Sequence, residues 1–307
     1  MSETASDPSP AVADFPAVAM IGLGNIGLPA ARRLLEAGHA VHGYRRSPCP
    51  ELVEAGGTFH GSAAEATTAS DLVFQCLPGE PALRASGLGE NGVVSAAREG
   101  QIVVELGTYT ADVKREYRDA LAARGAILVE AEVSGTPDLL AAGKAALFVG
   151  TDPDTFARVA PLLKTLSPAT IPVGDFGAAL SMKLVANLLV ATHTAVAAEA
   201  IALGEALGLD GRRIVDVIGK SPAASDMFRI RAPRMIARDY LPAPGPIATL
   251  AKYLDLIGDA GDAHGLSIPA FRAAKRAYEE AAEAGLAEHD IAVLREWVGA
   301  HRGMPDG

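Results

Sequence analysis

The sequence predicts two domains, an α/β Rossmann-type nucleotide-binding domain followed by an all-α domain that is entered through a long inter-domain helix. Three observations support this prediction. A glycine-rich loop joins an apolar run to a helical pattern near the start, short apolar runs then alternate with helical patterns, and from about residue 177 only helical periodicity remains. We place the domains at 16–175 and 176–307, after a flexible polar tail at 1–15.

The glycine-rich loop follows the first apolar run, which spans residues 18–21. Its sequence is Gly22-Leu23-Gly24-Asn25-Ile26-Gly27. Gly22 permits a tight strand-to-helix turn, Gly24 lets the backbone approach phosphates, and Gly27 allows helix and strand to pack closely. The N–H groups and the positive dipole end of the following helix then face an anion. We therefore expect this loop to bind the pyrophosphate of a dinucleotide.

The second predicted strand, 40–44, ends in a segment that favours NADP over NAD. An NAD-selective site carries an Asp or Glu about 20 residues beyond the glycines, where it bonds the ribose 2′-hydroxyl. This chain instead has two arginines between two hydroxyl-bearing residues, Tyr44-Arg45-Arg46-Ser47. Guanidinium groups suit a 2′-phosphate, although an arginine pair is also typical of a solvated turn. NADP (NADPH) is the predicted cofactor, and NAD is the less favoured one.

Further short apolar runs predict strands at 72–76, 102–105, 126–129, 145–149 and 169–172, with a helix at 112–123. Strands that alternate with helices indicate a mostly parallel sheet whose ligands lie at the carboxyl ends of the strands. Two loops belong to this edge. They are Leu77-Pro78, after the run at 72–76, and the segment 106–108, after the run at 102–105.

The helical half begins with one long apolar pattern at 177–208, followed by helices at 211–218, 247–263, 268–284 and 291–301. Lys183 stands near the start of the long helix, and Asn187 follows one turn later on the same face. A lysine in such a run can simply snorkel to the surface. In a crevice between the domains, however, Lys183 could donate a proton to a carbonyl oxygen as hydride arrives, while Asn187 positions the substrate or the lysine.

These features together resemble the β-hydroxyacid dehydrogenases, the family of 3-hydroxyisobutyrate dehydrogenase and tartronate semialdehyde reductase. The resemblance runs from about residue 17 to residue 297 and rests on four segments in the same order: 22–27, 131–136, 177–183 with Asn187, and Lys252 placed 17 residues before Pro269. It implies NAD(P)-dependent oxidation of a short 3-hydroxy acid, or reduction of the matching semialdehyde.

The resemblance also implies roles for individual residues. Lys183 matches the catalytic lysine of the family. Thr108 and Lys252 match cofactor contacts. The loop that holds the substrate carboxylate through backbone N–H groups and hydroxyls is matched by Ser134-Gly135-Thr136.

Four residues depart from the family pattern: Gly107 replaces a usual Ser, Ala179 a usual Gly, Tyr253 a usual Asp, and Glu132 a usual Pro. A carboxylate at 132 would repel an acidic substrate if it pointed into the site. The related imine reductases share the fold but typically lack the lysine, so Lys183 favours alcohol–carbonyl chemistry. Two alternatives stay open, an imine reductase-like NADPH-dependent enzyme in which Glu132 assists a cationic substrate, and a catalytically silent NADP-binding module.

The composition limits which kinds of binding partner the protein is expected to have. The net charge of −10 and the absence of a basic run argue against a nucleic-acid partner. Cys49, Cys76 and the histidines lack metal-ligand spacing, so we expect no metal and a reducing cytoplasm. The longest apolar region, 184–206, is interrupted by polar residues and favours a core helix over a membrane span. We expect a small-molecule substrate and a homodimer or homotetramer.

Overall fold

The computed structural model describes residues 14–300, so most of the tail expected at 1–15 lies outside the described residues. The chain divides into two compact units, one ending at Lys183 and the other beginning at Leu184. The division falls inside helix α10 (Ala178–Ala206), and the sequence prediction of one long helix in this region is confirmed.

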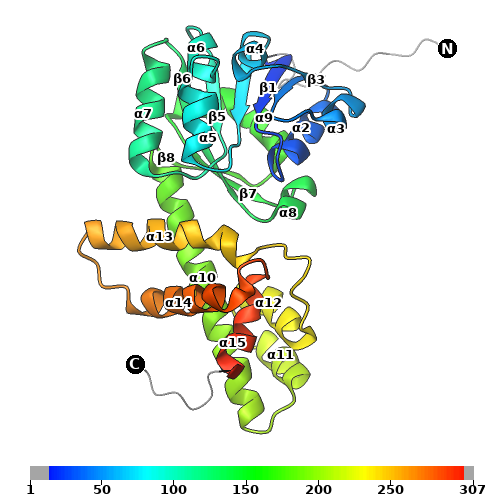
Figure 1. The fold of residues 1–307 in the computed structure, drawn as a ribbon, viewed down its shortest axis with the longest axis vertical. Coiled ribbons are helices and arrows are strands. Elements are labelled where there is room, and N and C mark those ends of the chain that lie inside the picture. Colours follow the sequence, from blue (N-terminus) through cyan, green and yellow to red (C-terminus); the bar gives the residue numbers. More distant parts are fainter. Residues whose placement is uncertain (1–13, 301–307) are drawn as a thin grey trace, which may run out of the picture. The chain divides into compact units, whose positions relative to one another are not determined.

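The first unit is built on one eight-stranded sheet with the order β3-β2-β1-β4-β5-β6-β7-β8. All neighbouring strands are parallel except β6 and β7, which are antiparallel. The strands are β1 (Ala17–Ile21), β2 (Ala40–Tyr44), β3 (Thr58–Phe59), β4 (Leu72–Gln75), β5 (Ile102–Glu105), β6 (Ile127–Ser134), β7 (Ala146–Gly150) and β8 (Thr170–Gly174) (Figure 1).

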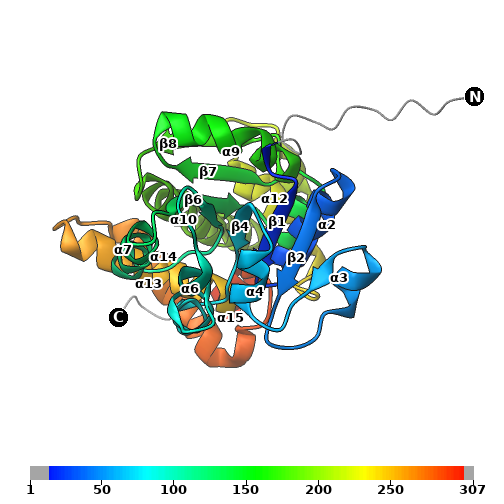
Figure 2. The same cartoon turned by 90° about the horizontal axis from the view of Figure 1, so that it is seen from above.

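Helices cover both faces of this sheet, as Figure 2 shows for α9 on one side and α4 and α6 on the other. The helical segments are α2 (Gly27–Glu36), α3 (Pro50–Glu54), α4 (Ala63–Thr68), α5 (Glu80–Leu83), the π-helical turn η1 (Arg84–Leu88), α6 (Val93–Ala96), α7 (Ala111–Ala122), α8 (Pro137–Ala141) and α9 (Pro153–Leu166). Alternate strand residues therefore enter two different cores, Met20 on one face and Ala19 on the other. A sheet buried on both faces explains the continuous apolar runs of the sequence.

One strand extends further than the sequence predicts. The expected strand at 126–129 continues as β6 to Ser134. Glu130 and Glu132 interrupt the apolar run, and for that reason the prediction ends before them. Both glutamates are nevertheless fully buried within the strand. Charged groups are rarely buried without a partner, so their surroundings matter for the site.

The second unit is all-helical, as expected. Its segments beyond α10 are α11 (Gly211–Gly219), α12 (Asp226–Ala237), α13 (Ile247–Ala263), α14 (Pro269–Ala281), the π-helical turn η2 (Ala282–Leu286), the 3-10 helix η3 (Ile291–Val293) and α15 (Leu294–Ala300). α14 packs on α10 through the buried Tyr278, whose hydroxyl donates to the carbonyl oxygen of Ala191 at 3.2 Å. By length and composition α10 could also cross a membrane, a property that apolar core helices share.

Candidate active site

The three glycines of the predicted phosphate loop have different structural reasons to be glycine. Gly22 has a φ of +98°, and a Cβ there would lie 2.0 Å from the carbonyl oxygen of Cys76. A Cβ on Gly27 would lie 1.8 Å from the carbonyl oxygen of Gly22. A Cβ on Gly24 would meet nothing within 4 Å. Gly22 and Gly27 are thus required by the fold itself, whereas the exposed Gly24 leaves open space at the start of α2, where a phosphate could approach the backbone.

The loop after β2 uses its two arginines differently. The guanidinium of Arg45 donates to the carbonyl oxygens of Pro48 at 2.6 Å and Leu23 at 3.2 Å, and it lies 3.4 Å from the carboxylate of Glu51. Arg45 therefore braces the turn against the glycine loop. Arg46 and Ser47 are exposed, and within residues 14–300 no hydrogen bond or ion pair holds the Arg46 guanidinium. Arg46 is the arginine of this pair that remains available to a ligand.

The loops after β4 and β5 are fastened to each other. Tyr109 donates its hydroxyl to the carbonyl oxygen of Leu77 at 3.0 Å, and burial raises the pKa of this phenol above its usual range. The next residue, Thr110, donates to the carboxylate of Glu80 from its backbone N–H at 3.0 Å and from its hydroxyl at 2.6 Å. The predicted cofactor loops at Leu77-Pro78 and Thr108 thus behave as one fixed edge of the sheet.

Beneath this edge lies a buried cluster of three carboxyl groups around one ammonium group. The Nζ atom of Lys114, on α7, lies 2.8 Å from Glu105, 3.4 Å from Glu130 and 2.6 Å from Glu132. All four side chains are 2% exposed or less. Burial raises the pKa of Glu105 to about 7, against the opposing effect of Lys114, and burial also raises the pKa of Glu130.

Sequence reasoning did not identify Lys114, Glu105 and Glu130 as part of the site region. The available signal was a pair of acids, at 105 and 130, in register on neighbouring apolar strands. Such acids need a buried cation, and Lys114 stands on the helix that follows β5.

Glu132 does not point into open space. Its side chain is fully buried, and its two oxygens accept hydrogen bonds from Lys114 at 2.6 Å and from the hydroxyl of Thr108 at 2.5 Å. The sequence left open that this carboxylate repels an acidic substrate or assists a cationic one. In the structure Glu132 has no solvent-exposed surface, and both of its oxygens are engaged inside the fold.

Lys183 lies beside the predicted carboxylate loop. Only 7% of the residue is exposed, and Nζ donates to the carbonyl oxygen of Val133 at 2.7 Å. The helix that carries Lys183 is held at its start by a hydrogen bond from the Gly177 N–H to the Glu130 carboxylate. Val133 directly precedes Ser134, so the first unit brings the ammonium group to the loop that the sequence assigns to the substrate.

In that loop, Gly135 has a φ of +154°, and Thr136 caps α8 by accepting from the N–H of Leu139 at 3.4 Å. The second unit holds the two remaining predicted residues. Asn187 is 7% exposed, and within the described residues its Nδ2 atom is buried without a hydrogen-bond partner. Lys252 lies on α13 with Nζ 4.9 Å from the ring centre of Tyr253. The proposed roles of all these residues stay predictions.

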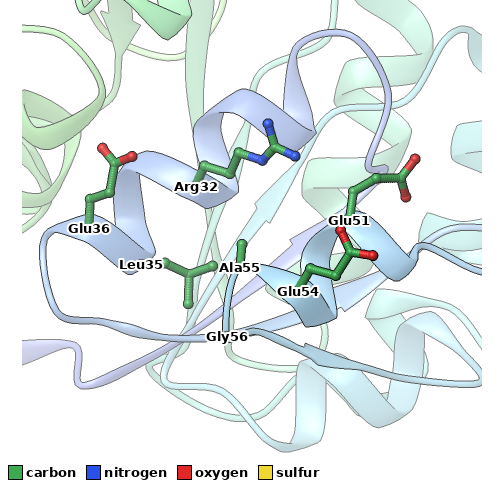
Figure 3. Close-up of a pocket in the computed structure, with 7 residues that line it drawn as sticks. All are labelled: Arg32, Leu35, Glu36, Glu51, Glu54, Ala55 and Gly56. Atoms are coloured by element: carbon green, nitrogen blue, oxygen red, sulfur yellow. The ribbon is translucent and has the colours of Figure 1, made fainter.

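A surface cavity of about 670 Å³ lies elsewhere on the first unit, between α2 and α3. Figure 3 shows its lining, which includes one guanidinium and three carboxylates: Arg32, Leu35, Glu36, Glu51, Glu54, Ala55 and Gly56. None of these residues belongs to the predicted site. Its acidic lining would repel the phosphates of a nucleotide, so the cavity gives no second candidate for the cofactor.

Two family models match the chain. The NAD-binding domain of 6-phosphogluconate dehydrogenase matches residues 17–174, and the NAD-binding domain of NADP-dependent 3-hydroxyisobutyrate dehydrogenase matches residues 177–297. The 3-hydroxyisobutyrate dehydrogenase of Pseudomonas aeruginosa is 32% identical over 206 residues, which are 66% of this chain and 69% of that protein.

Solved structures are similar to this chain over most of its length. The 3-hydroxyisobutyrate dehydrogenase of Mycobacterium tuberculosis, determined with L-serine, is 28% identical with a TM-score of 0.82, covering 92% of this chain and 99% of that one. An imine reductase from a Pseudomonas species, 22% identical with a TM-score of 0.60 and coverages of 92% and 98%, shares the fold. The chain therefore belongs to the 3-hydroxyisobutyrate dehydrogenase family and is an NAD(P)-dependent oxidoreductase that acts on the CH–OH group of hydroxy acids.

Proposed function

We propose that the protein uses NADP(H) to interconvert a short-chain 3-hydroxy acid and its semialdehyde or keto form, with Lys183 as the general acid and base. The observation that carries the proposal is the buried ammonium of Lys183, held 2.7 Å from the carbonyl oxygen of Val133 at the entrance to the 134–136 loop. When bound, the nicotinamide would supply or accept the hydride.

Lys183 would manage the proton that accompanies this hydride. An ammonium group has three N–H donors, so its bond to Val133 is compatible with donation to a substrate oxygen. In the reducing direction hydride adds to the carbonyl carbon, and Lys183 would donate its proton to the oxygen, where the negative charge develops. In the oxidising direction the neutral amine would take the proton back from the hydroxyl group. The bond to Val133 fixes the position of Nζ, which is what a proton donor requires.

The acid group of the substrate would be held by Ser134, Gly135 and Thr136. Hydroxyl and backbone N–H groups can bond a carboxylate without a permanent positive charge. Asn187 stands four residues beyond Lys183 on α10 and therefore on the same helix face. Among residues 14–300 its Nδ2 donor has no hydrogen-bond partner, and this supports a role in binding the substrate, because a buried amide without a partner is costly.

The preference for NADP would rest on Arg46 and Ser47. Arg46 is exposed, whereas the Arg45 guanidinium donates to backbone carbonyls of Pro48, in its own turn, and of Leu23, in the glycine loop. No acid occupies positions 44–47, where a carboxylate would repel a 2′-phosphate. The remaining predicted cofactor contacts are the loop 22–27, Tyr44, Arg45, Leu77-Pro78, Thr108 and Lys252.

A substrate panel tests the proposal. NADPH oxidation would be followed with short semialdehydes that carry a carboxylate, with the same aldehydes lacking it, with cyclic imines, and without substrate. We expect turnover of the acid semialdehydes, with kcat/KM at least tenfold above that of the aldehydes without a carboxylate, since one bonded carboxylate contributes about 1.5–3 kcal/mol. Turnover of imines alone would contradict the proposal and support the imine reductase-like alternative. No turnover of any compound would support a catalytically silent NADP-binding module.

The proposed assembly is a homodimer formed through α10. Val185, Val196 and Leu203 are 57–61% exposed, and Leu189 is 46% exposed. Their spacing of four and seven residues places them on one helix face, which a second copy presenting the same face would cover. Leu203→Lys should shift the mass measured by light scattering from dimer to monomer, whereas Val53→Lys, at an equally exposed apolar residue of α3, should not. An unchanged dimer in the first variant would exclude this face.

A further inference from the structure

We infer that Glu132 and Lys114 are positioning residues that fix the Thr108 hydroxyl as a hydrogen-bond acceptor toward the nicotinamide half of the cofactor. The inference deepens the proposed function and rests on it, because Thr108 as a cofactor contact is part of that proposal. Glu132 and Lys114 touch neither substrate nor cofactor in this scheme. They act through Thr108.

The hydrogen-bond chain has a fixed direction. The Lys114 ammonium can only donate, and it donates to one oxygen of Glu132 at 2.6 Å. The ionised carboxylate can only accept, so its other oxygen accepts the Thr108 hydroxyl proton at 2.5 Å. A hydroxyl has one proton. With that proton committed to Glu132, Thr108 can offer a ligand only its lone pairs.

The position of the Lys114 ammonium group favours Glu132 as a hydrogen-bond acceptor. Lys114 lies nearest to Glu132 among the three acids, at 2.6 Å against 2.8 Å and 3.4 Å. Three carboxylates and one ammonium would leave uncompensated negative charge in the interior, so the cluster retains protons. Burial raises the pKa of Glu105 to about 7 and also raises the pKa of Glu130, so these two carboxyl groups hold protons more readily than they would in water.

The backbone around Thr108 is equally fixed. The Gly107 N–H donates to Glu105, the Tyr109 hydroxyl donates to Leu77, and Thr110 donates to Glu80. The hydroxyl of Thr108 therefore cannot change its partner through a shift of the loop without breaking neighbouring contacts. A proline at position 132, usual in the family, has no carboxylate and would leave the Thr108 hydroxyl free to donate or accept.

The topology indicates which part of the cofactor meets Thr108. The predicted 2′-phosphate contact, Arg46, follows β2, which lies on one side of β1 in the sheet. Thr108 follows β5, two strands to the other side of β1. A dinucleotide across this edge places its adenosine half near β2 and its nicotinamide half near β5. The ligand group that meets Thr108 must then be a donor, namely a hydroxyl of the nicotinamide ribose or the N–H of the carboxamide.

A mutant cycle on cofactor binding tests the inference. NADPH affinity would be measured by fluorescence titration without substrate for wild type, Thr108→Val, Thr108→Ser, Glu132→Gln, and the double variant Thr108→Val/Glu132→Gln. We expect Thr108→Val to weaken NADPH binding about tenfold, Thr108→Ser to restore it, and Glu132→Gln to weaken it several-fold. If Glu132 acts through Thr108, the double variant should equal Thr108→Val within about twofold.

The fragment 2′,5′-ADP is the matched control ligand, because it lacks the nicotinamide half. Its affinity should be unchanged in every variant. Thermal unfolding would confirm that each variant is folded, and Glu132→Asp, which keeps the charge beside Lys114 while withdrawing the carboxylate from Thr108, replaces Glu132→Gln if the latter does not fold. Independent, additive losses would overturn the inference, as would normal NADPH binding by Thr108→Val or equal losses for 2′,5′-ADP. Since no substrate is present, a wrong assignment of substrate or of the Lys183 role leaves this result intact.

Discussion

Two loops at the same edge of the sheet handle charge in opposite ways. After β2, Arg46 is exposed and unpaired within the described residues, and only Arg45 is bound into the turn. After β5, Lys114 and its three acids are paired with one another inside the fold, and the Thr108 hydroxyl connects Glu132 to the loop at the edge. The exposed charge is suited to meeting a phosphate. The buried charges are suited to holding a neutral group in one orientation.

The largest expected difference between the two loops is in stability. Lys114→Met leaves three buried carboxyl groups without a cation and should lower the free energy of unfolding by about 3–5 kcal/mol, whereas Arg46→Ala should change it by less than about 0.5 kcal/mol. Urea unfolding of both variants at pH 7 measures the contrast. A loss below about 1 kcal/mol in Lys114→Met would mean that the cluster protonates and relaxes without its lysine.

The preference for NADPH over NADH should depend on Arg46, the residue whose loss hardly affects stability. Arg46→Ala should raise the dissociation constant of NADPH about 10- to 100-fold and leave that of NADH nearly unchanged, because only NADPH carries the 2′-phosphate. Arg45→Ala is the matched control. It removes the brace of the turn and should weaken both nucleotides to a similar degree. Equal effects of Arg46→Ala on both cofactors would contradict the proposed NADP preference.

The smallest expected effect is a pH dependence of stability that comes from the cluster. Burial raises the pKa of Glu105 to about 7, so the folded state binds a proton that the unfolded state has already released. The resulting stabilisation is complete below the usual glutamate pKa of about 4.3 and is lost as the pH rises through about 7. The free energy of unfolding should fall by about 1–3 kcal/mol between about pH 5 and pH 8.5, and Glu105→Gln should flatten this slope. An unchanged slope in that variant would assign the titration to another group.

Most of the fold could be predicted because its apolar periodicity is strong. The strands at 40–44 and 102–105 and the helix at 247–263 have the bounds that the sequence predicts. The prediction ended β6 early because Glu130 and Glu132 look like the end of a buried run. Their burial depends on Lys114, 16 and 18 residues away, and local periodicity does not contain that pairing.

The candidate site shows the same limit. The glycine spacing and the lysine on the long helix can be read directly, because backbone geometry and a proton donor require those residue types. The sequence does not show that Arg45 braces the turn while Arg46 stays exposed, because this depends on which guanidinium reaches the carbonyl oxygens of Leu23 and Pro48. Likewise, the family departure at Glu132 suggested a substrate contact, whereas its partners are a lysine and a threonine within the fold.

Single-turnover kinetics of Lys183→Met tests the proposed mechanism most directly. With NADPH bound and an acid semialdehyde added, the variant should reduce its substrate at least about 100-fold more slowly than wild type, because the proton donor is lost. NADPH affinity should stay within about threefold of wild type, since the lysine is assigned to the proton and not to the cofactor. A variant that turns over at the wild-type rate would contradict the role of Lys183 as general acid and base.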